Sequence, residues 1–224
     1  MPALTLPSLA RQLTAIGRRF YTRGWVLGTS GNLSAVLQRE PLRLAITASS
    51  VHKGDMRQSH VLQVDEAGRS VDRRAGRPSA ETLLHVEIVR RRGKRAGAVL
   101  HTHSVWGTIL SDTSTARDGL AIEGFEMLKG LGGVSTHEHR EWIPIVDNDQ
   151  DMERLSANVG ETLVRHPEAH AFLLRRHGLY TWGATVADAE RHVEILEFLF
   201  ETIGRTASFG AHTKETYHGA AQNS

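Results

Sequence analysis

The sequence predicts a single α/β domain in which a central β-sheet is flanked by α-helices. Segments with strand-like alternation or short apolar runs are interspersed with segments whose apolar residues recur every three or four positions. No repeat, low-complexity stretch or interdomain linker divides the chain. Its 224 residues are enough for one domain with a substantial core. We therefore expect helices and strands that share one core.

The first half of the chain predicts one helix, three strands, a second helix and a fourth strand. The first helix is expected to begin at an N-cap at Ser8 and to stop at Gly24, with apolar residues on one face. Strands are expected at 33–37, 44–46 and 61–64. A polar connection, 65–78, leads to a helix at 80–92 and a buried strand at 97–102.

The second half predicts three more strands and two helices. Strands are expected at 142–146, 171–174 and 178–182, with a helix at 152–163 between the first two. Thr185 and Asp188 resemble a capping box that opens the last helix. The domain is expected to span residues 8–205. The tail, 206–224, lacks apolar periodicity, and we expect it to be mobile.

Composition narrows the class of protein. Hydrophobic residues make up 40% and charged residues 23%, with a net charge of +2, as in ordinary soluble globular proteins. No membrane-spanning segment and no signal peptide are evident, so a cytoplasmic protein without membrane contact is expected. Without cysteine, any metal site must use His, Asp or Glu. The basic cluster at 90–95 is interpreted as a solvated helix end, and no nucleic-acid partner is expected.

Three histidines form a candidate metal site. His101 and His103 end an apolar run and are two residues apart, so on a strand both would face the same side. A second apolar run ends at His177. Three neutral imidazoles with an open fourth position suit a catalytic divalent cation, zinc first. The alternative is that these are core histidines satisfied by hydrogen bonds.

Three polar turns precede the His-x-His strand and could bind an anion. Each combines small residues with exposed backbone amides, and the last lies at a helix start, where a phosphate is favoured. Each turn alone could equally be an ordinary turn or helix cap. The residues concerned are Gly31 and Asn32, Ser49 and Ser50, and Ser79 with Glu81.

In this order the motifs resemble those of the class II aldolase/adducin family of metal-dependent aldolases, epimerases and dehydratases, over about residues 10 to 200. The resemblance implies a mostly antiparallel central sheet and a sugar-phosphate substrate. It implies phosphate binding by the residues of the three turns, Gly31, Asn32, Ser49, Ser50 and Ser79. It also implies one zinc ion per subunit on His101, His103 and His177, with Glu81 as an acid/base.

A further segment resembles the branch of the family that dehydrates 5-methylthioribulose 1-phosphate in methionine salvage. It runs from Gly124 to Gly130, and the resemblance implies that Glu126 is the catalytic acid/base. From spacing alone, Glu126 would be a solvent-facing charge on a short helix. A second His-x-His pair, His137 and His139, has no apolar strand before it and is interpreted as an exposed loop.

The resemblance leaves alternatives open. The family's aldolases usually carry Ser-Ser-Glu where this chain has Ala80 between Ser79 and Glu81, which argues against an aldolase or epimerase. A non-catalytic adducin-like interaction domain is expected to lack the metal histidines, which are present here. The resemblance also implies a homotetramer, in which a neighbouring subunit could complete the pocket.

Overall fold

The computed structural model describes residues 4–72, 76–113 and 118–220. Its centre is an eight-stranded sheet with the order β3-β2-β1-β4-β8-β7-β6-β5. The strands are β1 (Asn32–Arg39), β2 (Leu42–Thr47), β3 (Val61–Val64), β4 (Ala98–Thr102), β5 (Gly119–Ile122), β6 (Glu141–Val146), β7 (Ala171–Leu174) and β8 (Gly178–Gly183). Among the described strands, only β6 and β7 pair in parallel. The predicted α/β class with a mostly antiparallel central sheet is confirmed.

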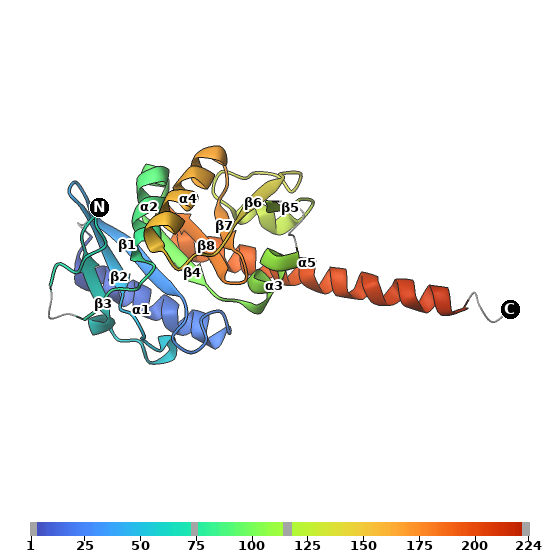
Figure 1. The fold of residues 1–224 in the computed structure, drawn as a ribbon, viewed down its shortest axis with the longest axis horizontal. Coiled ribbons are helices and arrows are strands. Elements are labelled where there is room, and N and C mark those ends of the chain that lie inside the picture. Colours follow the sequence, from blue (N-terminus) through green and yellow to red (C-terminus); the bar gives the residue numbers. More distant parts are fainter. Residues whose placement is uncertain (1–3, 73–75, 114–117, 221–224) are drawn as a thin grey trace.

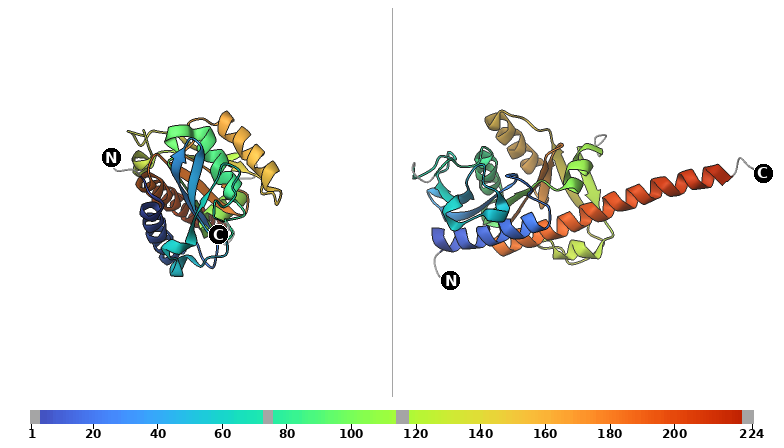
Figure 2. Two further views of the ribbon diagram at one scale, coloured as in Figure 1. Left: turned by 90° about the vertical axis from the view of Figure 1, so that its left-hand side faces the viewer. Right: turned by 90° about the horizontal axis from the view of Figure 1, so that it is seen from below.

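Helices cover both faces of the sheet (Figures 1 and 2). They are α1 (Leu6–Thr22), α2 (Thr82–Arg92), α3 (Val105–Thr113), α4 (Met152–Arg165) and α5 (Val186–Ala220). Helices α2 and α4 lie over one face, and α1 and the first part of α5 lie over the other. Of the described helices, none is long and apolar enough to cross a membrane.

The alternation of side chains along β4 decides which way its polar residues point. Val99 belongs to the core beneath α2 and α4, whereas Leu100 belongs to the core beneath α1. His101 follows Val99 by two residues and stacks on Tyr180, with ring centroids 3.9 Å apart. Thr102 points the opposite way and donates a hydrogen bond to Glu197 on α5. The strand therefore directs His101 toward the side covered by α2 and α4.

Of the two N-caps predicted from the sequence, the structure confirms one and contradicts the other. The predicted cap of the last helix is confirmed, because Thr185 Oγ1 accepts a hydrogen bond from the Asp188 amide at 3.1 Å. The predicted cap at Ser8 is wrong. Thr5 is the N-cap of α1, and its hydroxyl accepts a hydrogen bond from the Ser8 amide at 3.3 Å. Pro7 in the first turn explains the earlier start, since proline suits that position.

Two elements were not predicted, and one is longer than expected. Neither α3 nor β5 was expected from the sequence. Helix α5 extends through residues 206–220, for which a tail was expected, and beyond the sheet it continues as a single helix (Figure 1). That this part is mobile stays a prediction, and residues 221–224 lie outside the described part of the chain.

The basic cluster at the end of α2 is only partly solvated. Arg92 is buried, and its guanidinium donates hydrogen bonds to the carbonyl oxygens of Leu163 and His166 at 3.0 and 2.8 Å. It also lies 4.7 Å from the ring centre of Trp182. The expectation of a wholly solvated helix end is therefore wrong for Arg92, because the last carbonyl groups of α4 need donors.

Candidate active site

Two distant segments bring three histidines together at one end of the sheet. His101 ends β4, His103 follows that strand, and His177 lies in the turn between β7 and β8. The Nε2 atom of His177 lies 3.2 Å from the Nε2 atoms of both His101 and His103. The structure therefore gathers the three histidines that the sequence singled out.

The carboxylate of Glu81 completes the cluster. One of its oxygens lies 3.0 Å from Nε2 of His177 and the other 3.5 Å from Nε2 of His101. All four residues offer a ligand atom within 4.8 Å of the others. Three imidazoles and one carboxylate converging in this way form a donor set that suits a divalent cation.

Hydrogen bonding and burial leave the imidazoles ready to accept a cation. The Nδ1 atom of His101 donates to the carbonyl oxygen of Leu179 at 2.8 Å, which leaves the Nε2 lone pair facing the cluster. Burial lowers the pKa of His101 well below its ordinary value. Burial, reinforced by the charge of His177, lowers the pKa of His103 to about 4. Both rings are neutral at pH 7, as metal ligation requires.

A chain of hydrogen bonds orients Glu81. Asn32 at the start of β1 donates through Nδ2 to Glu81 at 2.5 Å and to the Ser79 hydroxyl at 3.1 Å. Burial alone would raise the pKa of Glu81, but the imidazoles of His101 and His177 and this amide hold it below its usual range. The carboxylate is therefore ionised and gives the cluster negative charge.

His85 on α2 fixes the orientation of that amide. Its Nδ1 accepts from the Ser34 hydroxyl at 2.7 Å, and its Nε2 donates to Oδ1 of Asn32. Burial lowers the pKa of His85 to about 4, so the ring is neutral and has one donor and one acceptor. With Oδ1 occupied, the amide nitrogen of Asn32 must face Glu81. Sequence reasoning missed His85, which looks like an ordinary helical residue.

A cavity of about 320 Å³ adjoins the cluster. It is lined by the residues expected to bind phosphate, Gly31, Asn32, Ser49, Ser50 and Ser79, together with Glu81, His103 and His177. Residues that the sequence did not suggest also line it, namely Lys53, Asn148, Gln150 and Met152. The polar run before α4 could have signalled Asn148 and Gln150, whereas a lone lysine in a loop carries no signal.

Glu126 lies apart from this cavity. It begins the short 3-10 helix η4 (Glu126–Gly130), and its side chain is 73% exposed. Its carboxylate lies 2.6 Å from Nζ of Lys129 and 3.9 Å from Nδ1 of His137, and the hydrogen bond from Lys129 lowers its pKa. Glu126 is not among the described residues that line the cavity. The fold of one subunit thus does not join it to the histidine cluster.

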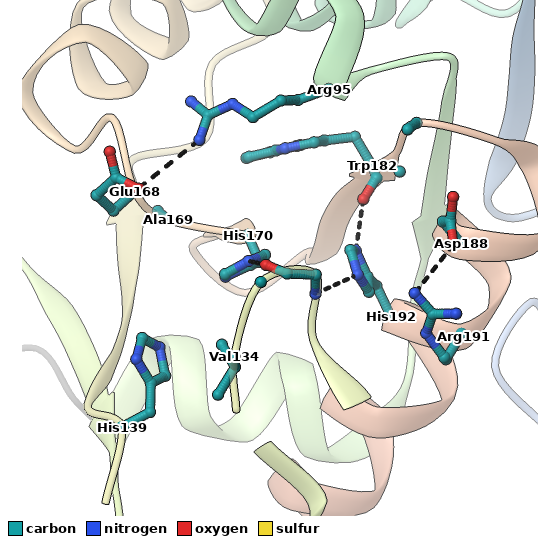
Figure 3. A pocket seen from close by; sticks show the side chains of 14 residues that line it. Arg95, Val134, His139, Glu168, Ala169, His170, Trp182, Asp188, Arg191 and His192 are labelled. Carbon is teal, nitrogen blue, oxygen red and sulfur yellow. Dashed lines mark hydrogen bonds and ion pairs between the residues drawn. The ribbon is translucent and has the colours of Figure 1, made fainter. Parts of the chain in front are cut away.

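A second histidine cluster holds the loop that follows η4 (Figure 3). His170 donates from Nε2 to the carbonyl oxygen of Gly132 at 2.8 Å, and the Gly132 amide donates to Nε2 of His192 at 3.0 Å. His170 and His139 also bind the buried carboxylate of Glu141, at 2.9 and 2.8 Å. The predicted exposed loop is confirmed for His137, which is exposed, whereas His139 in the same loop is only partly exposed. These groups border a cavity of about 460 Å³.

Comparisons with known proteins assign this chain to a family. Residues 11–203 match the model of the Class II Aldolase and Adducin N-terminal domain. The chain is 49% identical, over 86% of its length and 91% of the relative's, to a methylthioribulose-1-phosphate dehydratase from Methylococcus capsulatus. It is 46% identical to a protein of the same name from Pseudomonas fluorescens, over 92% of this chain and 97% of that one.

Solved structures share the fold. A putative aldolase/epimerase/decarboxylase from Escherichia coli superimposes with a TM-score of 0.73 at 27% identity, over 88% of this chain and 89% of that one. An L-fuculose-1-phosphate aldolase from Thermus thermophilus gives a TM-score of 0.73 at 22% identity, over 92% and 99% of the two chains. The second likeness extends to the fold alone.

Proposed function

The chain belongs to the class II aldolase and adducin family, and within it we propose that this protein is a methylthioribulose-1-phosphate dehydratase of methionine salvage. One observation carries the proposal. Relatives of that name match the chain at 49% and 46% identity over nearly their whole length. The cluster of three histidines and Glu81 supports it, because a non-catalytic relative would have no need of converging metal ligands.

We propose that His101, His103 and His177 hold one zinc ion, with Glu81 at the fourth position in the resting enzyme. The supporting observation is that all four ligand atoms converge and two of the rings are neutral. When bound, a divalent cation supplies a Lewis acid for a ketone or enediolate oxygen. Other divalent cations also suit three imidazoles and a carboxylate, so metal analysis of the purified protein tests the choice of zinc.

The reaction removes water from 5-methylthioribulose 1-phosphate and gives 2,3-diketo-5-methylthiopentyl 1-phosphate. A proton leaves C3, beside the C2 ketone, and the C4 hydroxyl departs as water once it has been protonated. The enol that remains becomes the diketone by moving a proton to C4. Hydroxide is a poor leaving group, so the step needs a proton donor as well as a base.

We propose that Glu126 takes the C3 proton and delivers one to the C4 hydroxyl, with Glu81 as an assisting group. Because Glu126 is exposed and away from the cavity of its own chain, the proposal places it in the pocket of a neighbouring subunit of a homotetramer. This arrangement explains why η4 carries a carboxylate on the surface. An ion pair with Lys129 keeps that carboxylate ionised, as a base requires.

We propose that the phosphate of the substrate lies against Gly31, Asn32, Ser49, Ser50 and Ser79. These residues line the cavity beside the cluster, so a phosphate bound there would hold the ketone near the metal site. Such binding supplies positioning rather than chemistry. For the enzyme in the cell, we propose the cytoplasm, where a protein without cysteine needs no oxidative maturation.

Substituting Glu126 tests the catalytic proposal. We expect Glu126→Gln to lower kcat by about 100-fold or more, because a general acid/base contributes on that order. The matched control is Glu123→Gln, which removes an exposed charge three residues away. Metal content and melting temperature should be unchanged in both. Near-normal turnover by Glu126→Gln would exclude this role.

A further inference from the structure

Lys53 is a buried lysine at the cavity beside the histidine cluster. It follows the turn that carries Ser49 and Ser50 and begins a short 3-10 helix (Lys53–Asp55). Only 1% of its surface is exposed, yet it is among the residues that line the 320 Å³ cavity. Lysines are almost never buried to this extent unless their charge is paired.

The ammonium group of Lys53 has hydrogen bonds but no counterion within the described part of the chain. Its Nζ donates to the carbonyl oxygens of Val51 and Thr29, at 3.0 and 3.3 Å. An ammonium has three N–H donors, so these two bonds leave one over. Glu81 is the acid whose charge acts on the pKa of Lys53, but no ion pair joins the two. Both oxygens of Glu81 already face His101, His177 and Asn32.

Apart from Lys53, the described protein groups around the part of the cavity expected to bind phosphate carry no positive charge. Of the described residues that line it, Lys53 is the single lysine or arginine. The turns at Gly31, Ser49 and Ser79 offer only neutral donors. A phosphate monoester carries up to two negative charges, and neutral donors alone leave such a group poorly compensated in a buried site.

We propose that the ammonium group of Lys53 binds the phosphate of the substrate and supplies the positive charge of that subsite. The inference rests on the proposed function, in that the substrate is a phosphate ester. The two backbone carbonyl oxygens hold Nζ in place, and its third N–H is left for a phosphate oxygen. The fixed position makes Lys53 a binding residue that is ordered before the substrate arrives.

The protonation state of Lys53 agrees with this role. Burial lowers its pKa to about 8, and the charge of Glu81 acts in the opposite direction. The amine is therefore still mainly charged at pH 7. A bound phosphate would stabilise the charged form further.

Binding of inorganic phosphate to the metal-loaded enzyme, measured by titration calorimetry, tests the proposal. We expect Lys53→Met to weaken phosphate binding about tenfold or more, since a hydrogen bond to a charged group is worth that much. The matched control, Lys94→Met, removes an exposed positive charge and should leave phosphate binding within about twofold. Affinity for 5-methylthioribulose, which lacks the phosphate, should be the same in all three proteins.

Lys53→Gln is the second neutral variant. It keeps N–H donors for the two carbonyl oxygens and carries the test if Lys53→Met does not fold. Unchanged phosphate affinity in a folded, metal-loaded neutral variant would overturn the proposal, as would equal weakening of phosphate and 5-methylthioribulose. Because phosphate binding needs no turnover, the wild type can fail as a dehydratase while the calorimetry still decides the role of Lys53.

Discussion

At the scale of single residues, Gly31 shows how closely the loop before β1 approaches the metal cluster. Its φ angle is +69°, in the left-handed region. A Cβ atom there would lie 2.7 Å from the carbonyl oxygen of His101 and 2.6 Å from the side chain of Val26. Only glycine satisfies both conditions, so the loop can pass directly over the end of β4.

Gly31→Ala should therefore destabilise the protein by about 2 kcal/mol or more, from backbone strain and the collision with His101 together. Gly28→Ala is the matched control. Gly28 has a similar φ of +60°, but nothing lies within 4 Å of its Cβ position, so about 1 kcal/mol is expected. Denaturant unfolding of both variants measures the difference, and equal losses would show that the collision is relieved cheaply.

The residues of the site differed in how well they could be predicted. His101 and His103 follow from the period of a strand, and Gly31 and Ser79 from turn chemistry. Glu81 was recognised through its motif. Lys53 and His85 could not be found, because their importance lies in burial beside the cavity and beside Asn32. Spacing along the chain carries no information about such contacts.

At the scale of elements, strands and long amphipathic helices were predicted well, whereas α3 and β5 were missed. The four-residue β5 lies at the edge of the sheet. Helix α3 has only nine residues, and of its described large apolar residues Leu110 is buried while Val105 and Ile109 are exposed, so its apolar positions do not mark one core-facing stripe. Weak periodicity in short elements explains both omissions. Packing between elements also explains why Arg92 is buried, since it joins the end of α2 to the end of α4.

Replacing Arg92 should separate these two helix ends. We expect Arg92→Met to lower the free energy of unfolding by about 3 kcal/mol, since it leaves buried carbonyl groups at the end of α4 without donors. Arg91→Met is the control. It removes an exposed pair with Glu87 one helical turn away and should cost about 0.5 kcal/mol or less. If the two variants unfold at the same denaturant concentration, Arg92 is not a structural link.

The pair of His170 and Glu141 predicts a pH dependence of stability. Burial opposes the charge on His170, but its hydrogen bond to Glu141 raises the pKa of His170 overall. Because the pKa of His170 in the folded protein is above its unfolded value of about 6.5, the pair's contribution to the free energy of unfolding is complete below that pH. It is lost as the pH rises through the folded pKa. The stability difference between wild type and His170→Gln should therefore shrink as the pH rises above about 6.5.

At low pH, protonation of Glu141 removes the stabilising effect of the same pair. Burial opposes its charge, but hydrogen bonds from His170 and His139 lower its pKa. Its contribution is present above the unfolded value of about 4.3 and is lost as the pH falls. Urea unfolding at a series of pH values measures the loss of stability at both the acid and the alkaline side. A wild-type-to-variant difference that stays constant as the pH rises above about 6.5 would contradict the charged state of His170.

At the scale of the whole molecule, one subunit separates the groups that the proposed reaction brings together. The histidine cluster and its cavity lie where β4 ends and β8 begins, whereas Glu126 is exposed on η4. The sequence could place both motifs on the chain but not in space, because subunit contacts leave no periodic signal. The role proposed for Glu126 therefore implies that a second copy of the chain completes each pocket.

Mixing two inactive variants tests that arrangement. Glu126→Gln keeps the metal cluster, and His177→Ala keeps Glu126. In mixed oligomers some pockets combine an intact cluster from one subunit with Glu126 from the other. We expect activity well above that of either variant alone after subunit exchange. Mixtures that stay inactive, although exchange is shown by mass spectrometry, would place Glu126 in the pocket of its own subunit.

The central claim is that this protein dehydrates 5-methylthioribulose 1-phosphate at a metal held by His101, His103 and His177. Turnover of that substrate before and after chelation, followed as diketone formation, tests it most directly. We predict turnover that disappears with a chelator and returns when zinc or another divalent cation is restored. A folded, metal-loaded protein that forms no diketone, or one whose turnover is indifferent to the chelator, would contradict the account.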